Sequence, residues 1–518
     1  REQTLNRLLE CVLKERVILV HSPPMTGKTA LTQLFEHYLL QSRSRVFRIS
    51  LLWMERSNSS WTFEKRFEDL MKMTWDGFLD QCGKETFLIV DEVQKIYKPE
   101  NEDEPHHGGK VFWDQFKRIM QSTSLHIVAF ASYGHYGAYT VDGDHAIMDI
   151  SPYRLPKSNA WGFADVCFTE EEFHDYFDHF CEKNLEMLQK EDTPLLSHYV
   201  SAITAFHPGL VAFTMEKIHA RFVKHTFKSL TFAKVFAYLK SRDFNAHFMD
   251  VRAMPRITYM SDAEKKLVDT VLFKKGGLKI KTSAIPHEGR IIKTNILVDT
   301  AMTTDYNHSI LDFPAPLLRA TYLQNRFGSV TRSKSPPNTF RDFITLVFAK
   351  MDPKVLQKSK GTGVDGRLLE RVWQMEFYRA SMQVLPEDVH ASVDAGAVFG
   401  SKGYIDFYIN DHRNWAIELL RDGDKLEQHQ KRFQEGGIYI PILKYAKEGA
   451  VIDIRNNKKG FPEGHGKDDI YVLCAENFES VQLMYPDGTK EVVQLLGKEE
   501  DLLGYNISEF LEDSMETD

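Results

Sequence analysis

Cysteine is scarce in this chain, and the few cysteines present form no familiar pattern. The 518 residues include five, at Cys11, Cys82, Cys167, Cys181 and Cys474. They include no CxxC pair and no cysteine–histidine spacing typical of a zinc site, and an odd, sparse set is not a disulfide framework. These absences exclude a disulfide scaffold and a structural zinc site, and they predict a reducing compartment.

Long apolar runs and an excess of basic charge are also missing. No hydrophobic stretch approaches the length that spans a bilayer. The formal net charge is −8, so the protein is not coated in basic surface, and any nucleic-acid contact must be a local groove. Hydrophobic content of 42% and charged content of 27% are ordinary for globular proteins, and the length predicts two to four domains.

What the chain does contain is a phosphate-binding pattern near its N-terminus. An apolar strand at residues 17–21 leads through a turn into Gly27-Lys28-Thr29 and then a helix. The backbone N–H groups of such a loop surround an anion, and the helix N-terminus faces it. Lys28 is expected to reach the β and γ phosphates of ATP or GTP, and the Thr29 hydroxyl to bind Mg²⁺. The residues expected to bind the nucleotide are Ser22, which stands where the Walker A pattern has glycine, Pro23, Pro24, Met25, Thr26, Gly27, Lys28 and Thr29.

A second signal supports the first. Residues 86–92 form an apolar strand that ends in Asp91 and Glu92, as expected for a strand buried on both faces of a parallel sheet. We expect Asp91 to hold Mg²⁺ and Glu92 to orient or deprotonate the attacking water. A further apolar strand, 125–131, ends at Ser132, which either senses the γ-phosphate or is only a turn residue. Arg154 is a positional candidate for an arginine finger.

Patterning along the chain predicts several modules. Strands and helices alternate first, then helices dominate, then a helix is followed by a β-ribbon, and a Pro-rich polar stretch reads as a linker. The ribbon module either contacts DNA or only packs against its neighbours. The expected organisation is a P-loop NTPase core at 1–168, a helical lid at 169–250, a winged-helix-like module at 251–327, a linker at 328–340, an α/β domain at 341–500 and an acidic tail at 501–518.

The last third suggests a second chemistry. A helix at 367–384 precedes strand-like runs at 389–399, 403–409 and 415–420. Asp406 interrupts the second run and Glu418 the third. A buried carboxylate requires a cation partner. Together with Glu376 on the helix, these acids would form an oxygen cage suited to Mg²⁺. The alternative is that Asp406 and Glu418 are surface acids on edge strands.

This order of elements resembles the restriction-endonuclease-like PD-(D/E)xK fold. That resemblance implies Asp406 and Glu418 as metal ligands in an α/β nuclease domain. The family pattern has Glu-x-Lys on the third strand, whereas this chain reads Glu418-Leu419-Leu420. We expect Arg421 or Lys425 to replace the lysine in space and His429 to carry a proton.

A more specific resemblance covers nearly the whole chain. Residues 417–433, 437–439 and 451–455 are similar to the C-terminal half of Crinkler-type effectors, and 22–29 with 87–92 to their NTPase half. Trypanosomal retrotransposon hot spot proteins have the same plan. The resemblance implies a secreted protein that acts inside host cells, often in the nucleus, on double-stranded host DNA.

Two functions from different classes follow. The first is an ATP-dependent or ATP-regulated, Mg²⁺-dependent DNA endonuclease. The second is a nucleotide-switched interaction protein, whose nuclease-like domain has lost catalysis and only binds DNA or a nuclear partner. Assembly into a homo-oligomer is open in both. The basic residues that either contact DNA phosphates or form a solvated face are Lys354, Lys358, Lys360, Arg367 and Arg371.

Overall fold

The computed structural model groups the chain into two compact units. Unit 1 comprises residues 1–183, 204–216 and 251–318, and unit 2 comprises 184–203, 217–250 and 319–518. Each unit is described by itself. The structure describes residues 1–54, 62–82, 85–97, 109, 111–113, 119, 124–132, 157–223, 229–239, 241–249, 251–254, 257–273, 277–281, 291, 296–302, 308–327, 336–357, 359, 370–386, 389, 391–395, 399, 401, 403, 405–410, 413–462 and 469–495.

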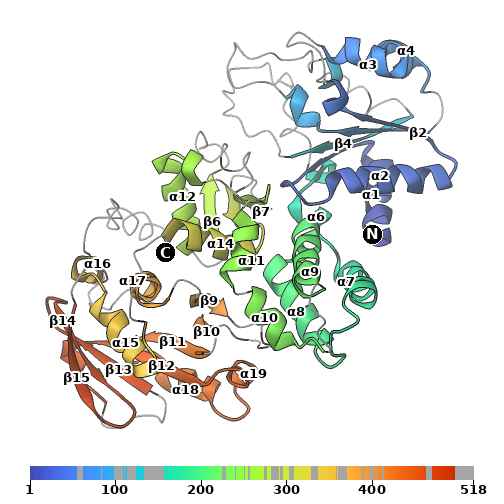
Figure 1. The fold of residues 1–518 in the computed structure, drawn as a ribbon. Coiled ribbons are helices and arrows are strands. Elements are labelled where there is room, and N and C mark those ends of the chain that lie inside the picture. The colour runs from blue at the N-terminus through green and yellow to red at the C-terminus, as the bar shows by residue number, and fades with distance from the viewer. Residues whose placement is uncertain are drawn as a thin grey trace, which may run out of the picture. The chain divides into compact units, whose positions relative to one another are not determined.

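Unit 1 is built on a five-stranded parallel sheet with the order β2-β3-β4-β1-β5. Strands β2 and β4 of this sheet are labelled in Figure 1. This order sets β4 between the strand that enters the phosphate loop and the strand that ends at Asp91. The carboxyl ends of β1, β4 and β3 are therefore neighbours at one edge. The strands are β1 (Val17–His21), β2 (Arg45–Ser50), β3 (Thr86–Asp91), β4 (Leu125–Ala131) and β5 (Ala160–Trp161).

Helices cover both faces of this sheet, because alternate strand residues point to opposite sides. On one side Ile18, Val20 and Ile89 pack with helices α1 (Glu2–Glu15) and α2 (Lys28–Gln41). On the other, Leu19 and Val90 pack with an aromatic cluster from α3 and α4. The remaining helices of this region are α3 (Phe63–Met71), α4 (Trp75–Asp80) and the short turns η1 (Leu51–Met54), η2 (Val93–Ile96) and η4 (Lys157–Asn159).

The rest of unit 1 is helical with a small sheet. The antiparallel sheet β6-β8-β7 follows helix α12, which is the helix and β-ribbon expected between residues 251 and 327. Whether it meets DNA stays a prediction. The elements are α6 (Phe163–Val166), α7 (Glu170–Asn184), α9 (Pro208–Phe222), whose later residues belong to unit 2, η5 (Ile257–Tyr259), α12 (Asp262–Phe273), β6 (Leu278–Lys281), β7 (Val298–Met302) and β8 (His308–Asp312).

Unit 2 is built on a seven-stranded mixed sheet in the order β15-β14-β13-β12-β11-β10-β9. Strands β9 to β11 form an antiparallel meander, β12 and β13 run parallel to β11, and the last two strands return antiparallel. The strands are β9 (Ala391–Ala395), β10 (Ile405–Ile409), β11 (Trp415–Arg421), β12 (Glu448–Asn456), β13 (Asp469–Cys474), β14 (Ser480–Met484) and β15 (Lys490–Gln494).

Aromatic contacts attach helices to this sheet. Phe377 of α17 lies 5.0 Å from Phe407 of β10, and Phe343 of α15 lies 5.2 Å from Trp415 of β11, measured between ring centroids. Phe236 of α10 lies 6.1 Å from Tyr408 of β10. The described helices of unit 2 are α8 (Thr193–Thr204), α10 (Phe232–Leu239), α11 (Arg242–Met249), α14 (Pro316–Phe327), whose first residues belong to unit 1, α15 (Phe340–Ala349), α16 (Pro353–Gln357), α17 (Glu370–Val384), α18 (Leu426–Phe433), α19 (Ile440–Leu443) and the turn η7 (Asn457–Lys459).

The segment expected to be one helical lid, 169–250, is divided between the two units, because α8, α10 and α11 fall in unit 2, where Phe236 of α10 contacts Tyr408 of the seven-stranded sheet. Most of the linker at 328–340 and all of the tail at 501–518 lie outside the described residues. All five cysteines are free thiols. Within the described part of the chain, no helix is both long and apolar enough to cross a membrane.

Candidate functional site

The phosphate loop between β1 and α2 is closed by its own side chains. The Ser22 hydroxyl is hydrogen-bonded to the Thr26 hydroxyl, which donates to the Pro23 carbonyl at 2.8 Å. Gly27 adopts φ 79°, a left-handed conformation in which glycine is favoured. Ser22 thus fills the position of the usual glycine with a hydroxyl that fastens the loop.

Lys28 reaches back across the loop from the first turn of α2. Its ammonium donates to the carbonyls of Ser22 at 2.6 Å and Pro23 at 2.7 Å. Burial lowers the pKa of Lys28 to about 8; Glu92 and Asp91 act in the opposite direction, and Arg252 lowers the pKa further. A cation held on a partly buried loop in this way is suited to binding phosphate oxygens.

The end of β3 meets this loop. The Thr29 hydroxyl donates to Asp91 Oδ2 at 3.0 Å, so the two expected magnesium ligands lie together. Burial raises the pKa of Asp91, against the hydrogen bond from Thr29. Beyond Asp91, the Gln94 side chain bonds the Glu92 carboxylate and also accepts from the Ser132 amide at 3.1 Å. Gln94 therefore joins the residues that end β3 and β4.

The start of α9 covers the loop from the side. A Cβ built on Gly209 would lie 2.1 Å from the Met25 carbonyl, so only glycine permits this approach. His207, just before the helix, is fully buried, and its Nε2 has no hydrogen-bond partner. Burial lowers the pKa of His207 to about 3, so the ring is neutral at pH 7.

This buried histidine predicts acid sensitivity. Because its pKa is lowered on folding, the unfolded chain takes up a proton below about pH 6.5 while the folded chain does not, until about pH 3. Stability should therefore fall as pH falls through this window, by about 2 kcal/mol at pH 5. Urea unfolding at pH 7, 6 and 5 would measure it. The loss should shrink in His207→Gln and persist in a control variant of the exposed His37; an equal loss in both variants would refute it.

The structure thus brings the expected nucleotide-binding residues together. Gln94, His207 and Gly209 lie with them, although the sequence did not indicate a role for these three. The sequence signal for His207 and Gly209 is only that they flank Pro208 in a turn at the start of a helix. Ser132 contributes its backbone amide, so its sensing role stays a prediction. Arg154 lies outside the described residues.

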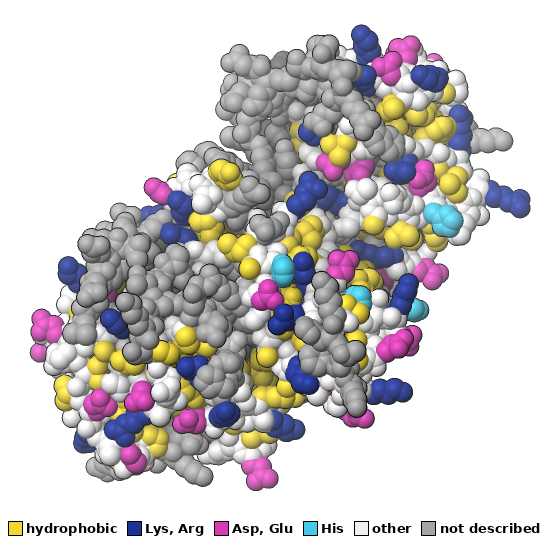
Figure 2. Space-filling model, viewed as in Figure 1, with side chains coloured by type: hydrophobic (Ala, Val, Ile, Leu, Met, Phe, Trp, Pro, Cys, Tyr) yellow, Lys and Arg dark blue, Asp and Glu magenta, His cyan; other side chains and the backbone are white. Residues whose placement is uncertain are grey.

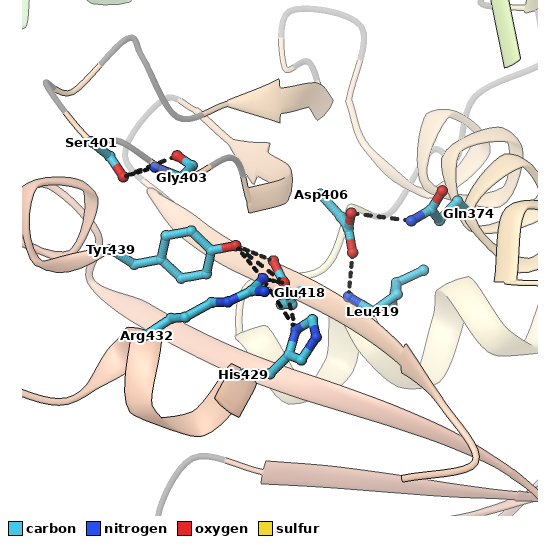
Figure 3. A network of polar contacts seen from close by, with 9 residues as sticks. All are labelled: Gln374, Ser401, Gly403, Asp406, Glu418, Leu419, His429, Arg432 and Tyr439. Atoms are coloured by element: carbon cyan, nitrogen blue, oxygen red, sulfur yellow. Dashed lines mark hydrogen bonds and ion pairs between the residues drawn. The ribbon is translucent and has the colours of Figure 1, made fainter. Parts of the chain in front are cut away.

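In unit 2, Asp406 is fixed at the junction of β10, β11 and α17. Its Oδ1 accepts from Gln374 of α17 at 3.1 Å, and its Oδ2 accepts from the backbone amide of Leu419 at 2.6 Å (Figure 3). Leu419 directly follows Glu418. The two acids singled out in the sequence therefore lie beside the same stretch of β11, each with its own hydrogen-bond partners.

Glu418 lies at the centre of a polar cluster and is only 3% exposed. Its Oε1 is bonded by His429 Nδ1 at 2.8 Å and by Arg432 Nη1 at 2.9 Å. The Tyr439 hydroxyl lies 3.0 Å from Oε2. Burial and the Glu418 charge raise the pKa of Tyr439, so its hydroxyl keeps its proton and donates. The cation that a buried carboxylate requires is therefore supplied by Arg432.

Two expectations about this site require correction. Glu376 does not lie behind Asp406, because it is buried in an ion pair with Arg379 and accepts from the Asp352 amide at 2.6 Å. Gln374 occupies that place instead. The three-carboxylate cage is wrong as well: among the described residues, no group of three His, Cys, Asp or Glu side chains is placed to hold a metal ion. Burial raises the pKa of Glu376, and Arg379 opposes this rise.

The residues expected to replace the missing lysine or to carry a proton do not all lie at Glu418. His429 contacts Glu418 directly, whereas Arg421 is the last residue of β11, three positions after Glu418 and so on the opposite face of the strand. Lys425 is an exposed residue that precedes α18. Arg432 and Tyr439 were missed, although both lie near His429 in the sequence. Of the predicted basic cluster, Lys354 is exposed; the side chains of Lys358, Lys360, Arg367 and Arg371 lie outside the described residues.

Charge over the described surface is mixed. Figure 2 shows basic and acidic side chains interspersed on the face in view, in line with the net charge of −8. Any nucleic-acid contact on this face would have to be local.

This chain is remotely similar in structure to several solved proteins. No protein-family model matches the chain, and no curated protein matches it. Among solved structures, a Walker-type ATPase of Pyrococcus abyssi is 15% identical over 62% of this chain and 95% of its own, with a TM-score of 0.35. The RuvB Holliday junction branch migration motor of Thermotoga maritima is 9% identical over 60% and 91%, with a TM-score of 0.29. Domain III of the Thermotoga maritima replication initiation protein DnaA is 14% identical over 46% and 90%, also with a TM-score of 0.29.

Proposed function

We propose that unit 1 binds and hydrolyses ATP, or GTP, with Mg²⁺. The observation that carries this proposal is the hydrogen bond between Thr29 and Asp91, at 3.0 Å, beside the Lys28 ammonium. A hydroxyl and a carboxylate in contact are the oxygen ligands that Mg²⁺ takes in P-loop proteins. The ion, when bound, neutralises charge on the phosphates. Lys28 exchanges its two loop carbonyls for phosphate oxygens, and Glu92 orients the attacking water.

Glu92→Gln tests this assignment by separating binding from hydrolysis. The amide keeps the shape of the side chain and removes the base, so nucleotide affinity should stay within a few-fold. Turnover should fall roughly 100-fold or more, the usual contribution of a general base. Fluorescent-nucleotide binding and phosphate release would measure the two quantities. Glu68→Gln, on the exposed face of α3, is the matched control, and loss of binding in Glu92→Gln would assign Glu92 a different role.

We propose further that unit 2 cleaves DNA, as a nuclease of the restriction-endonuclease-like type. The support is topological: helix α17 precedes the antiparallel meander β9-β10-β11, and α18 follows before β12 joins parallel to β11. Asp406 and Glu418 lie on the second and third strands of the meander. This is the order of elements that the sequence resemblance implies.

Asp406 and Glu418 could supply some of the ligands of a divalent ion. Mg²⁺ is commonly held by one or two carboxylates with waters and substrate phosphate, and Asp406 and Glu418 would supply those carboxylates. Asp406 accepts a hydrogen bond from Gln374 at Oδ1 and one from the Leu419 amide at Oδ2. Glu418 is already neutralised by Arg432, and its Oε2 is contacted only by Tyr439 among these partners. The ion would polarise the scissile phosphate and lower the pKa of a bound water.

The occupied state of Glu418 also favours a second function. A carboxylate that accepts from arginine, histidine and tyrosine together can be a purely structural centre, and unit 2 would then bind DNA or a nuclear partner without cutting. Nicking of supercoiled plasmid by the purified protein, with Mg²⁺ or Mn²⁺ and with or without ATP, decides between them. Metal-dependent nicking supports the nuclease; retention of DNA without nicking supports the binding protein.

On the Crinkler resemblance, we propose that the protein acts after secretion, in the nucleus of a host cell, with double-stranded DNA as its partner. The support is the paired NTPase and nuclease motifs in their order along the chain. A tagged protein expressed in a plant or animal cell should accumulate in the nucleus and be recovered with DNA. Exclusion from the nucleus would contradict this proposal without affecting the two enzymatic ones.

A further inference from the structure

The position two residues after Glu418, where the nuclease pattern has a lysine, carries no positive charge in this chain. In a strand, residues two apart share a face, so a lysine at that position would lie beside the carboxylate. Leu420 occupies it instead and is only 3% exposed. An apolar, buried side chain cannot contact a phosphate. If unit 2 cuts phosphodiesters, the cation must reach the site from another element.

Helix α18 supplies such a cation. Arg432 lies one turn after His429 and directs Nη1 to Glu418 Oε1 at 2.9 Å and to the Tyr439 hydroxyl at 3.2 Å (Figure 3). Tyr439 is itself fully buried, and Gly403 lies so close that an added Cβ would meet the Tyr439 ring at 3.0 Å. The tyrosine is therefore fixed, and it fixes the guanidinium against Glu418.

Arg432 also keeps donors for a ligand. A guanidinium has five N–H donors, and among the described residues neither Nε nor Nη2 of Arg432 has a hydrogen-bond partner. Its side chain is 34% exposed, whereas that of Glu418 is 4% exposed. One nitrogen thus holds the carboxylate, and the side chain that carries the remaining donors is partly exposed to solvent. Paired N–H groups of this kind match the oxygens of a phosphate.

We propose that Arg432 is the phosphate-contacting cation of the unit 2 site, in the role that a lysine on β11 would have. The inference rests on the proposed nuclease function and deepens it. Arg432 would orient Glu418 through Nη1 and bind an oxygen of the scissile DNA phosphate through its free donors. Charge that develops on the phosphate during cleavage would then be stabilised by a pre-positioned donor.

The experiment compares Arg432→Met and Arg432→Lys with Lys431→Met, which removes an exposed positive charge from the neighbouring position of the same helix. Single-turnover plasmid nicking with Mg²⁺ or Mn²⁺ is the first readout. We expect a loss of roughly 100-fold or more for Arg432→Met, the scale of removing one donor to developing charge. Arg432→Lys should lose less, and Lys431→Met should match the wild type. Wild-type nicking by Arg432→Met would overturn the inference.

The second readout does not depend on cleavage. Affinity for a duplex oligonucleotide is measured against salt in EDTA, and loss of one phosphate contact should reduce the slope of log affinity against log salt by about one. We expect this change in Arg432→Met and not in Lys431→Met. If the wild type never nicks DNA, the nuclease proposal fails, and this slope alone decides whether Arg432 binds phosphate. Equal slopes in all three proteins would overturn the inference.

A folding control completes the design, because Arg432→Met leaves the buried Glu418 charge without its cation. The double variant Glu418→Gln/Arg432→Met has no unpaired charge. Compared with Glu418→Gln alone, it should show the same reduction of the salt slope if Arg432 contacts phosphate. An unchanged slope in this pair would overturn the inference even if the single variant did not fold.

Discussion

Lys28→Ala is expected to abolish nucleotide hydrolysis, with a loss of roughly 100-fold or more in phosphate release. Lys28 is the one side-chain cation that the phosphate loop itself carries, and its ammonium is already held at that loop by the carbonyls of Ser22 and Pro23. No other residue of the loop can replace a positive charge at the β and γ phosphates. Phosphate release under saturating ATP and Mg²⁺ is the measurement.

The control for this change is Lys65→Ala, which removes an exposed lysine from α3 of the same unit. Both variants should melt close to the wild type, because the Lys28 contacts lie at the partly exposed loop and not in the core of the sheet. Undiminished hydrolysis by Lys28→Ala would remove the basis for the nucleotide-hydrolase proposal. A parallel loss in Lys65→Ala would instead indicate general damage to unit 1.

The second large effect is expected from Asp406→Asn. DNA nicking should be lost by roughly 100-fold or more, because the amide cannot hold a divalent cation as a carboxylate does. ATP hydrolysis should stay near wild type, since Asp406 belongs to unit 2 and the phosphate loop to unit 1. The two activities measured on one preparation give a direct test.

Asparagine is preferred to alanine at this position for a structural reason. Asp406 Oδ2 accepts from the Leu419 amide and Oδ1 from Gln374. Alanine would leave the amide without its partner, at a cost of about 1–3 kcal/mol, whereas asparagine keeps one acceptor. Asp424→Asn, in the exposed turn after β11, is the matched control. Nicking retained in Asp406→Asn would exclude Asp406 from the chemistry, and joint loss of ATP hydrolysis would contradict the separation of the two sites.

Local patterns along the chain were sufficient to predict the residues of the proposed nucleotide site. A strand, a glycine-containing loop and a helix must follow one another in sequence for a phosphate loop to form, so Gly27, Lys28 and Thr29 could be assigned without coordinates. The acids at the end of a second buried strand belong to the same edge of a parallel sheet, which predicted that Asp91 and Thr29 lie near one Mg²⁺; the structure places the two side chains in direct contact. Gln94 and His207 could not be assigned in this way, because their roles depend on which strand ends and which helix lie beside the loop.

In the seven-stranded sheet of unit 2, too, the sequence predicted the strands but not the partners of their acidic residues. Apolar runs interrupted by Asp406 and Glu418 predicted three strands and a need for a compensating cation. Which cation it is could not be read from spacing, because a strand and the helix after it meet at an angle set by packing. The structure selects Arg432 and His429 for Glu418, and it commits Glu376 to Arg379.

The sequence by itself therefore determined the elements and the chemical types: a phosphate loop, a pair of strand-end acids and two carboxylates that interrupt apolar strands. Periodicity and turn residues act over a few positions, and these features are local. Only the tertiary structure decided the partners, including Gln374 beside Asp406, Arg432 and Tyr439 around Glu418, and the packing of α10 with the second sheet. Such contacts join residues far apart in the chain, and they are chosen by the shape and hydrogen-bonding needs of the whole core rather than by any neighbouring residues.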